Sequence, residues 1–495
     1  MKADISTLHK PDILILRRHA HLAPFPSARF CASLIPMPLL IRNADIVTVG
    51  CRFAADIYAE KETITRIGEN LDAPPDTEII DASGKLVFPG FIDPHVHIYL
   101  PFMATFAKDT HQTASIAALV GGTTTYIEMC CPNRNDDALA GYQLWKSKAA
   151  GNSACDYAFH MSVTKFVNET ETQLRQVVAD GTASFKIFLA YKNFFGVDEA
   201  EMFQTLALAK KLGVIVTAHC ENAELVARLQ QQLLAEGKTG PEWHEPSRPE
   251  SVEAEGTGRF ATFLENTGAV GYVVHLSCEK ALHAALSARQ RGVRLSVESV
   301  LPHLLLDKSL AERPGVEGMK YVMSPPLRAK FNQDILWNGL ALGLVDTVGT
   351  DHCPFDLEQK LLGKNSFTTI PNGIPGIEDR VNLLYTYGVK RNRIDLERFV
   401  DCASTRAAKL FGLFPRKGTI AVGSDADLVI YDPAYRGTIT VKSQYTNSDY
   451  NGFEGLPIEG RPSVVTVRGK IQVQDGVFVG DPQRGQFLKR LPSYS

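Results

Sequence analysis

The residues with the clearest chemical potential are two histidines at the end of a short apolar segment, Phe91-Ile-Asp-Pro-His-Val-His-Ile98. Side chains alternate between the two faces of a strand, so His95 and His97 share one face. Two imidazoles on one face, where a strand ends, can bind one metal ion together. Because an isolated His-x-His also occurs in ordinary polar turns, this pair predicts a metal site only if further ligands join it.

Further candidate ligands lie in or just after other short apolar segments: Lys186 within Ser184-Phe-Lys-Ile-Phe188, His219, His275 after Val274, and Asp351 within Gly349-Thr-Asp-His352. A buried lysine is costly as a cation, so we expect Lys186 to be neutralised, paired or modified. Each residue alone has an ordinary structural explanation, such as a core histidine or a helix cap. Together, four histidines, a carboxylate and a lysine predict a site with nitrogen and oxygen ligands, for which zinc is the usual ion.

The elements that must position these ligands alternate between short strands and amphipathic helices. Eight strands are predicted, at residues 91–98, 122–129, 156–163, 184–190, 214–219, 271–276, 293–298 and 345–350. This alternation is typical of βα units and a parallel sheet, and eight units predict an α/β fold with a (β/α)8 TIM-like barrel. Catalytic groups of such barrels lie at the C-terminal ends of the strands, where the candidate ligands fall. An open, doubly wound sheet is the structural alternative.

Both ends of the chain carry a different pattern. Residues 37–89 and 416–480 alternate short apolar and polar runs with turn residues, so we expect them to build one smaller β-sandwich domain beside the barrel of residues 90–415. Residues 481–495 are expected to form a C-terminal arm. Residues 1–36 contain several arginines and histidines and few acids, and we expect a poorly ordered N-terminal extension there.

Composition narrows the class of protein. The chain has 495 residues, 44% of them hydrophobic, which suffices for a large core. Its 52 basic and 55 acidic residues leave a net charge of −3 without a long basic run, so neither nucleic acid nor a membrane surface is an expected partner. No apolar stretch approaches the roughly 20 residues of a membrane span. Nine scattered cysteines without a Cys-x-x-Cys pair favour a reducing compartment, and we expect a cytoplasmic protein.

Five motifs resemble those of the cyclic amidohydrolases in the amidohydrolase superfamily, and most closely the D-hydantoinase/dihydropyrimidinase family. They are Gly90-Phe-Ile-Asp-Pro-His-Val-His97, Ser184-Phe-Lys-Ile-Phe-Leu-Ala-Tyr-Lys192, Met323-Ser-Pro-Pro-Leu-Arg328, Gly349-Thr-Asp-His-Cys-Pro-Phe355 and Pro371-Asn-Gly-Ile-Pro-Gly-Ile-Glu378. The likeness covers the chain from Met37 to its end. It implies hydrolytic ring opening of 5-substituted hydantoins and dihydropyrimidines to N-carbamoyl amino acids.

The resemblance also implies a binuclear zinc site, although Mn²⁺ or Co²⁺ would accept the same ligands. Its ligands would be His95, His97 and Asp351 at the more buried ion, His219 and His275 at the other, and Lys186, carbamylated by CO2 or bicarbonate, bridging both. A hydroxide between the ions would attack a ring carbonyl. Asp351 would take its proton and pass it to the leaving nitrogen.

The remaining implied roles concern the substrate and the assembly. Tyr191 would stabilise the oxyanion, and backbone groups at Ser324 and Asn372 would face the imide edge of the ring. We expect Phe188, Phe195 and the loop at residues 99–106 around the exocyclic substituent, with packing in the core as the alternative. A homotetramer is implied by the resemblance as well.

Three other functions share parts of this pattern. Dihydroorotases carry an arginine two residues after the second histidine, where this chain has Tyr99, so a carboxylate-bearing ring would lack its counter-charge. Allantoinase, or another hydrolase of cyclic ureides or imides, shares the chemistry, although the motifs around Tyr191 and Asn372 favour hydantoin and dihydropyrimidine rings. A non-catalytic assembly protein of the same fold would show replacements among the six metal ligands, and none is replaced here.

Overall fold

The computed structural model describes residues 37–192 and 194–494, so the predicted extension at residues 1–36 lies outside the described residues. Eight parallel strands form the barrel: β6 (Phe91–Val96), β9 (Thr123–Cys130), β10 (Asp156–Ser162), β11 (Ser184–Phe188), β12 (Ile215–His219), β13 (Val270–Val273), β14 (Leu295–Val300) and β15 (Thr347–Gly349). They pair in chain order, and an isolated parallel bridge between Val96 and His352 joins β6 to the segment just after β15. The predicted fold class is therefore confirmed, with a strand at each of the eight predicted places.

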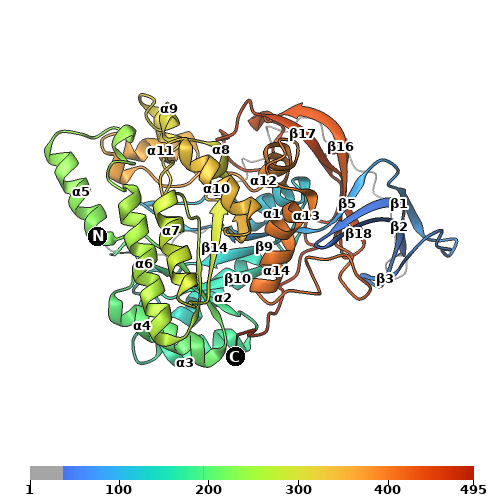
Figure 1. Ribbon diagram of the computed structural model, residues 1–495, viewed down its shortest axis with the longest axis horizontal. Helices are drawn as coiled ribbons and strands as arrows, with labels where there is room; N and C mark the ends of the chain where they lie inside the picture. The colour runs from blue at the N-terminus through green and yellow to red at the C-terminus, as the bar shows by residue number, and fades with distance from the viewer. Residues whose placement is uncertain (1–36, 193, 495) are drawn as a thin grey trace. The chain divides into compact units, whose positions relative to one another are not determined.

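The strands form because they are short apolar runs that can be buried on both faces, as parallel strands require. Every residue of β9, β10, β11 and β12 is buried. The helices follow the strands, and several pack against them (Figure 1). Their bounds are α1 (His111–Val120), α2 (Ala138–Ala149), α3 (Thr170–Ala179), α4 (Glu199–Leu212), α5 (Ala223–Ala235), α6 (Glu250–Thr267), α7 (Glu279–Gln290) and α10 (Phe331–Ala341).

Helix α4 shows how local sequence fixes these boundaries. The side chain of Asp198 accepts a hydrogen bond from the backbone N–H of Glu201, and the side chain of Glu201 accepts one from the backbone N–H of Asp198. The two bonds form a capping box. Gly213 ends the helix at a φ of 65°, in the left-handed region that glycine adopts readily. Six shorter helices lie in the second half of the barrel: α8 (Leu301–Leu305), α9 (Val316–Met319), α11 (Leu357–Lys360), α12 (Arg380–Leu384), α13 (Leu396–Val400) and α14 (Arg406–Leu410).

Strands from both ends of the chain form a second sheet, in which blue and red strands lie together in Figure 1. They are β1 (Leu39–Thr48), β2 (Cys51–Glu60), β3 (Thr63–Gly68), β4 (Glu78–Asp81), β5 (Leu86–Pro89), β16 (Leu428–Thr438), β17 (Pro457–Val467), β18 (Lys470–Gln474) and β19 (Val477–Phe478). The two sets meet where β5 pairs with β16, antiparallel. All nine strands lie within residues 37–89 and 416–480, and the domain boundaries themselves stay a prediction.

A buried cluster of charges joins the end strands to the barrel. The ammonium of Lys417 lies 2.6 Å from carboxylate oxygens of both Asp156, at the start of β10, and Asp427. Arg468 pairs with the same Asp156. These groups are almost fully buried, where removing one partner of an ion pair typically costs about 3–5 kcal/mol.

The C-terminal segment packs on the barrel of its own chain. The N–H of Gly485 donates to the carbonyl of Ser153, and the N–H of Leu488 to that of Tyr157. The guanidinium of Arg490 is fully buried and donates to the carbonyl of Phe159. A role of this segment between subunits stays a prediction. Among the described helices, none is both long enough and apolar enough to cross a membrane.

Candidate active site

One cavity at the C-terminal ends of the barrel strands is lined by every residue predicted for the site: His95, His97, Lys186, Tyr191, His219, His275, Ser324, Asp351 and Asn372. They come from the ends of β6, β11, β12, β13 and β15 and from two segments after β14 and β15. The barrel therefore brings together residues separated by up to 277 positions in the sequence (Asn372 minus His95).

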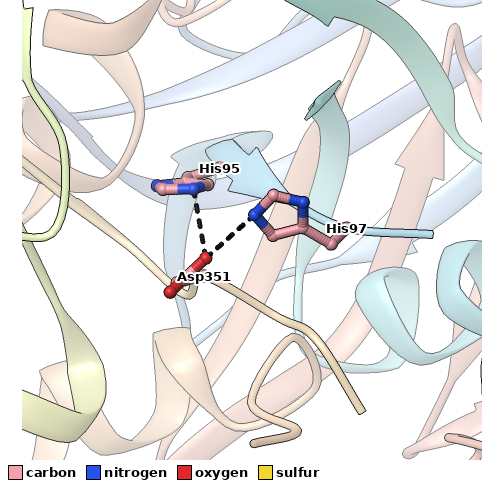
Figure 2. Close-up of side chains that lie close together, drawn as sticks. All are labelled: His95, His97 and Asp351. Atoms are coloured by element: carbon pink, nitrogen blue, oxygen red, sulfur yellow. Dashed lines mark ion pairs between the residues drawn. The ribbon is translucent and has the colours of Figure 1, made fainter. Parts of the chain in front are cut away.

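Three of the predicted ligands converge on one point. Nε2 of His95 lies 3.1 Å, and Nε2 of His97 lies 3.2 Å, from the same oxygen, Oδ1 of Asp351 (Figure 2). One ligand atom from each of the three residues lies within 4.8 Å of the others. Nε2 of His95 is buried yet makes no hydrogen bond. Donor atoms clustered in this way fit a metal ion with nitrogen and oxygen ligands.

The other three predicted ligands border this cluster. The ring centroids of His219 and His275 are 4.5 Å apart, and those of His275 and His95 are 5.4 Å apart. The Nζ atom of Lys186 is buried without a hydrogen-bond partner, 4.7 Å from the centroid of the Phe188 ring. Burial lowers the pKa of Lys186 to about 8. Unpaired buried nitrogens are costly, so a second metal position and a modified lysine fit this half of the cavity.

Two buried glutamates that orient the histidines were missed in the sequence. Glu298, in β14, bonds to Nδ1 of His95 at 2.7 Å and accepts the backbone N–H of His275 at 3.0 Å. Glu221 lies 2.7 Å from Nε2 of His219 and 2.6 Å from Arg248. Such partners fix the orientation of each ring and leave its other nitrogen available to a metal ion. A glutamate inside the apolar run of β14 was the available signal for Glu298.

Replacing Glu298 with glutamine is expected to weaken metal retention about 10–100-fold, because the charge that orients His95 is lost. Metal content after dialysis against a graded series of chelator concentrations measures the effect. Glu265→Gln, an exposed position on α6, is the matched control. Equal retention by Glu298→Gln and the wild type would contradict the orienting role.

Three of the lining residues have a backbone conformation that non-glycine residues rarely adopt. The φ angles are 58° at Tyr191, 41° at His275 and 51° at Asp351. Each follows a barrel strand by two or three residues, at the point where the chain turns away from the barrel. Left-handed non-glycine residues cost free energy and are enriched in functional sites. At these positions the turn directs the side chain into the cavity.

A polar wall of the cavity is built by hydrogen bonds among three residues. Nδ2 of Asn372 donates to Oγ of Ser324 at 2.9 Å and to the hydroxyl of Tyr191 at 3.4 Å. Oδ1 of Asn372 is buried without a partner. This wall therefore offers hydrogen-bonding groups to a polar ligand.

The apolar part of the cavity contains only part of the predicted substituent site. Phe188, Phe195, Leu100 and Phe102 line it. Of the loop at residues 99–106, only Leu100 and Phe102 reach the cavity; Tyr99 does not, and its ring packs against His111 with centroids 5.5 Å apart. A second cavity of about 210 Å³ adjoins the first and shares Phe102, Tyr191 and Asn372 with it.

A (β/α)8 barrel with clustered histidines and a carboxylate at its strand ends has the arrangement expected of a metal-dependent barrel hydrolase. Residues 86–472 match the amidohydrolase family. The chain is 45% identical over 456 residues to the D-hydantoinase of Geobacillus stearothermophilus, covering 92% of this chain and 97% of that protein. It is 39% identical over 460 residues to dihydropyrimidinase 1 of Caenorhabditis elegans, covering 92% and 94%.

A solved structure of a D-hydantoinase also resembles this chain over most of its length. The D-hydantoinase (dihydropyrimidinase) from Thermus sp. superposes with a TM-score of 0.92 at 76% identity, covering 92% of this chain and all of that one. The chain therefore belongs to the amidohydrolase family, among its D-hydantoinase and dihydropyrimidinase members, as its motifs predicted. It is an enzyme of the cyclic amidohydrolase type.

Proposed function

We propose that the enzyme opens 5-substituted hydantoins and dihydropyrimidines by hydrolysis, giving N-carbamoyl amino acids, at a binuclear zinc site. The observation that carries this proposal is the convergence of all six predicted metal ligands and all three predicted ring contacts on one cavity. The names of the related proteins support the choice of substrate class.

The cavity offers a ligand set for two ions: His95, His97 and Asp351 for one, His219 and His275 for the other, with Lys186 between them. Because the set contains no thiolate, Mn²⁺ or Co²⁺ could replace Zn²⁺. When bound, the ions would ionise water at neutral pH and polarise the ring carbonyl.

Lys186 suits carbamylation by CO2. In that reaction the neutral amine forms an N–C bond to CO2 and loses a proton, so the buried cation becomes an anion. With a pKa of about 8, about a tenth of the amine is neutral at pH 7, against roughly 0.03% at the ordinary lysine pKa. The carbamate would place two oxygens among the metal positions and remove the unpaired buried ammonium.

The chain's own residues would then direct protons and the ring. Burial opposes the ionisation of Asp351, but His95 and His97 hold its pKa well below the ordinary value, so the carboxylate is available as a base. It would take the proton of the attacking water and pass that proton to the leaving ring nitrogen. Burial raises the pKa of Tyr191, which keeps its hydroxyl protonated and able to donate to the carbonyl oxygen. Backbone groups at Ser324 and Asn372 would hold the imide edge.

Removing the Tyr191 hydroxyl is expected to lower kcat about 10²–10³-fold, the usual cost of one oxyanion donor. In Tyr191→Phe, KM and metal content should change little, because the ring and the ligands remain. Steady-state kinetics with metal analysis measures this, and Tyr387→Phe, outside the cavity, is the control. A kcat within threefold of the wild type would remove Tyr191 from the mechanism.

The proposal as a whole is tested by metal analysis together with hydrolysis of dihydrouracil, 5-phenylhydantoin and allantoin. We expect about two metals per chain and N-carbamoyl products from the first two rings, with activity lost to a chelator and restored by Zn²⁺. A metal-loaded enzyme that opens only allantoin would replace the proposed substrate class. A wild type that binds no metal and opens no ring would favour an assembly protein instead.

The same proposal includes a cytoplasmic homotetramer and the division into barrel, end-strand domain and C-terminal arm. Each follows from the resemblance to cyclic amidohydrolases and from the reducing environment that the cysteines indicate. Light scattering tests the assembly, since four chains of 54.4 kDa are expected per particle. A particle with the mass of one chain would overturn it.

A further inference from the structure

A buried lysine that the mechanism does not use lies behind the polar wall of the cavity. Lys360, the last residue of α11, has no exposed surface. Its ammonium donates to three backbone carbonyls, those of Val322 at 2.9 Å, Pro371 at 2.6 Å and Gly373 at 2.8 Å. Among the described residues no aspartate or glutamate forms an ion pair with it. Main-chain oxygens are therefore the hydrogen-bond acceptors of this ammonium, and the ring of Phe355 lies beside it, with its centroid 5.7 Å from Nζ.

These three carbonyls belong to the two segments that carry the proposed ring contacts. Val322 precedes Ser324 by two residues, and Pro371 and Gly373 are the neighbours of Asn372 on either side. The N–H of Gly373 also donates to the carbonyl of Val322 at 3.0 Å, so the two segments already touch where Lys360 binds them. Lys360 does not line the cavity, whereas Ser324 and Asn372 do. Its contact with any substrate is therefore indirect.

The chemistry of the side chain fits this place. An ammonium supplies three N–H donors from one atom, so it can satisfy three carbonyls that converge on one point. Burying a cation without a carboxylate is costly, and three charge-assisted hydrogen bonds offset part of that cost. An apolar side chain of similar size would leave the carbonyls of Pro371 and Gly373 without this donor, while the Val322 carbonyl would keep the Gly373 N–H. The two unpaired carbonyls would be expected to separate or to admit water.

The wall that Lys360 holds has little room to adjust. Gly373 has a φ of 142°, and a Cβ atom there would lie 2.4 Å from the carbonyl oxygen of Cys353. On the other side, Ser324 and Asn372 are joined by a 2.9 Å hydrogen bond. A small shift of either segment therefore changes the distance between the two groups that would face the ring.

We propose that Lys360 is a positioning residue, which sets the spacing between the Ser324 and Asn372 segments and thereby the affinity for the imide edge of the substrate. This inference rests on the proposed function, because it concerns the same ring. Replacing Lys360 should change substrate binding, since Lys360 contacts none of the six proposed metal ligands, Asp351 included.

The test is the Lys360→Met variant, which keeps the length of the side chain and removes the charge and all three donors. With dihydrouracil and 5-phenylhydantoin we expect KM to rise at least about tenfold, while kcat falls less than threefold and metal content matches the wild type. Lys360→Gln, which retains two N–H donors, should give an intermediate KM. Lys364→Met removes the same charge from an exposed position four residues later and should behave as the wild type.

The possible outcomes separate this inference from the proposed function. An active Lys360→Met enzyme with an unchanged KM would overturn the inference and leave the function standing. So would a variant that loses metal and kcat at constant KM, because that is the result of a purely structural role. If Lys360→Met does not fold, the same division between KM and kcat decides the matter in Lys360→Gln. A metal-loaded wild type that opens neither ring would overturn both.

Discussion

Replacing Lys186 with alanine is expected to lower kcat/KM by at least about 10³-fold, a loss of about 4 kcal/mol of transition-state stabilisation. The reason is that a carbamylated Lys186 would be the anion shared by the two proposed metal positions. Metal content should fall from about two ions per chain to one or none, because the bridging ligand is gone. Metal analysis and steady-state kinetics on the same preparation measure both effects.

Rescue distinguishes a carbamate from other roles of this lysine. Alanine leaves space beside the ring of Phe188, so acetate or propionate should enter it and restore part of the activity and of the metal content. Lys211→Ala, exposed on α4, controls for the loss of a positive charge. Full metal content and full activity in Lys186→Ala would contradict the bridging role, whatever the effect of added acid.

Replacing Asp351 with asparagine is expected to lower kcat about 10²–10⁴-fold, the usual range for a lost general acid or base. The amide oxygen can still approach a metal, so metal content should fall less than in Lys186→Ala. A base acts only when deprotonated, so the wild-type activity that depends on Asp351 is lost as the pH falls below the pKa of its carboxyl. That acidic decline of kcat/KM should disappear from the residual activity of Asp351→Asn.

Asp334→Asn, exposed on α10, is the matched control for this variant. A kcat for Asp351→Asn above a tenth of the wild-type value would assign the proton transfer to another group. Loss of both metals, without a change in the rate of the fraction that stays loaded, would limit Asp351 to metal binding.

Much of the scaffold could be predicted from the sequence, because the barrel strands are short apolar runs and α4 carries its own caps. The ends of some strands could not. The predicted strand at residues 271–276 ends at Val273, since His275 takes a left-handed φ and leaves the ladder. The strand at residues 184–190 stops at Phe188, just before the turn at Tyr191. Both deviations lie at the cavity, where side-chain direction takes precedence over strand pairing.

The contacts of Glu298 and Lys360, which hold cavity residues in place, could not be predicted from the sequence for a different physical reason. The partner of His95 is Glu298, 203 residues away, and a buried glutamate in a strand has no periodic signature that reveals its contact. Lys360 ends a helix of four residues, which looks like an ordinary polar turn until the three carbonyls around it are seen. The convergence of the proposed metal ligands on one cavity was predictable because strand ends collect on one face of a barrel. Their partners depend on three-dimensional packing alone.

The pairing of β5 with β16 has a consequence for synthesis of the chain. The strand Leu86–Pro89 cannot form this pairing until Leu428–Tyr431 has been synthesised. The charge cluster around Lys417 and the hydrogen bonds of the buried Arg490 form later still. At about 5–20 residues per second, a ribosome needs roughly 20–70 s to make the 339 residues from Gly90 to Leu428 (428 minus 89). Throughout that time one edge of β5 lacks its partner and is open to association with other chains. The nascent protein therefore depends most on protection from aggregation while its catalytic barrel is being made.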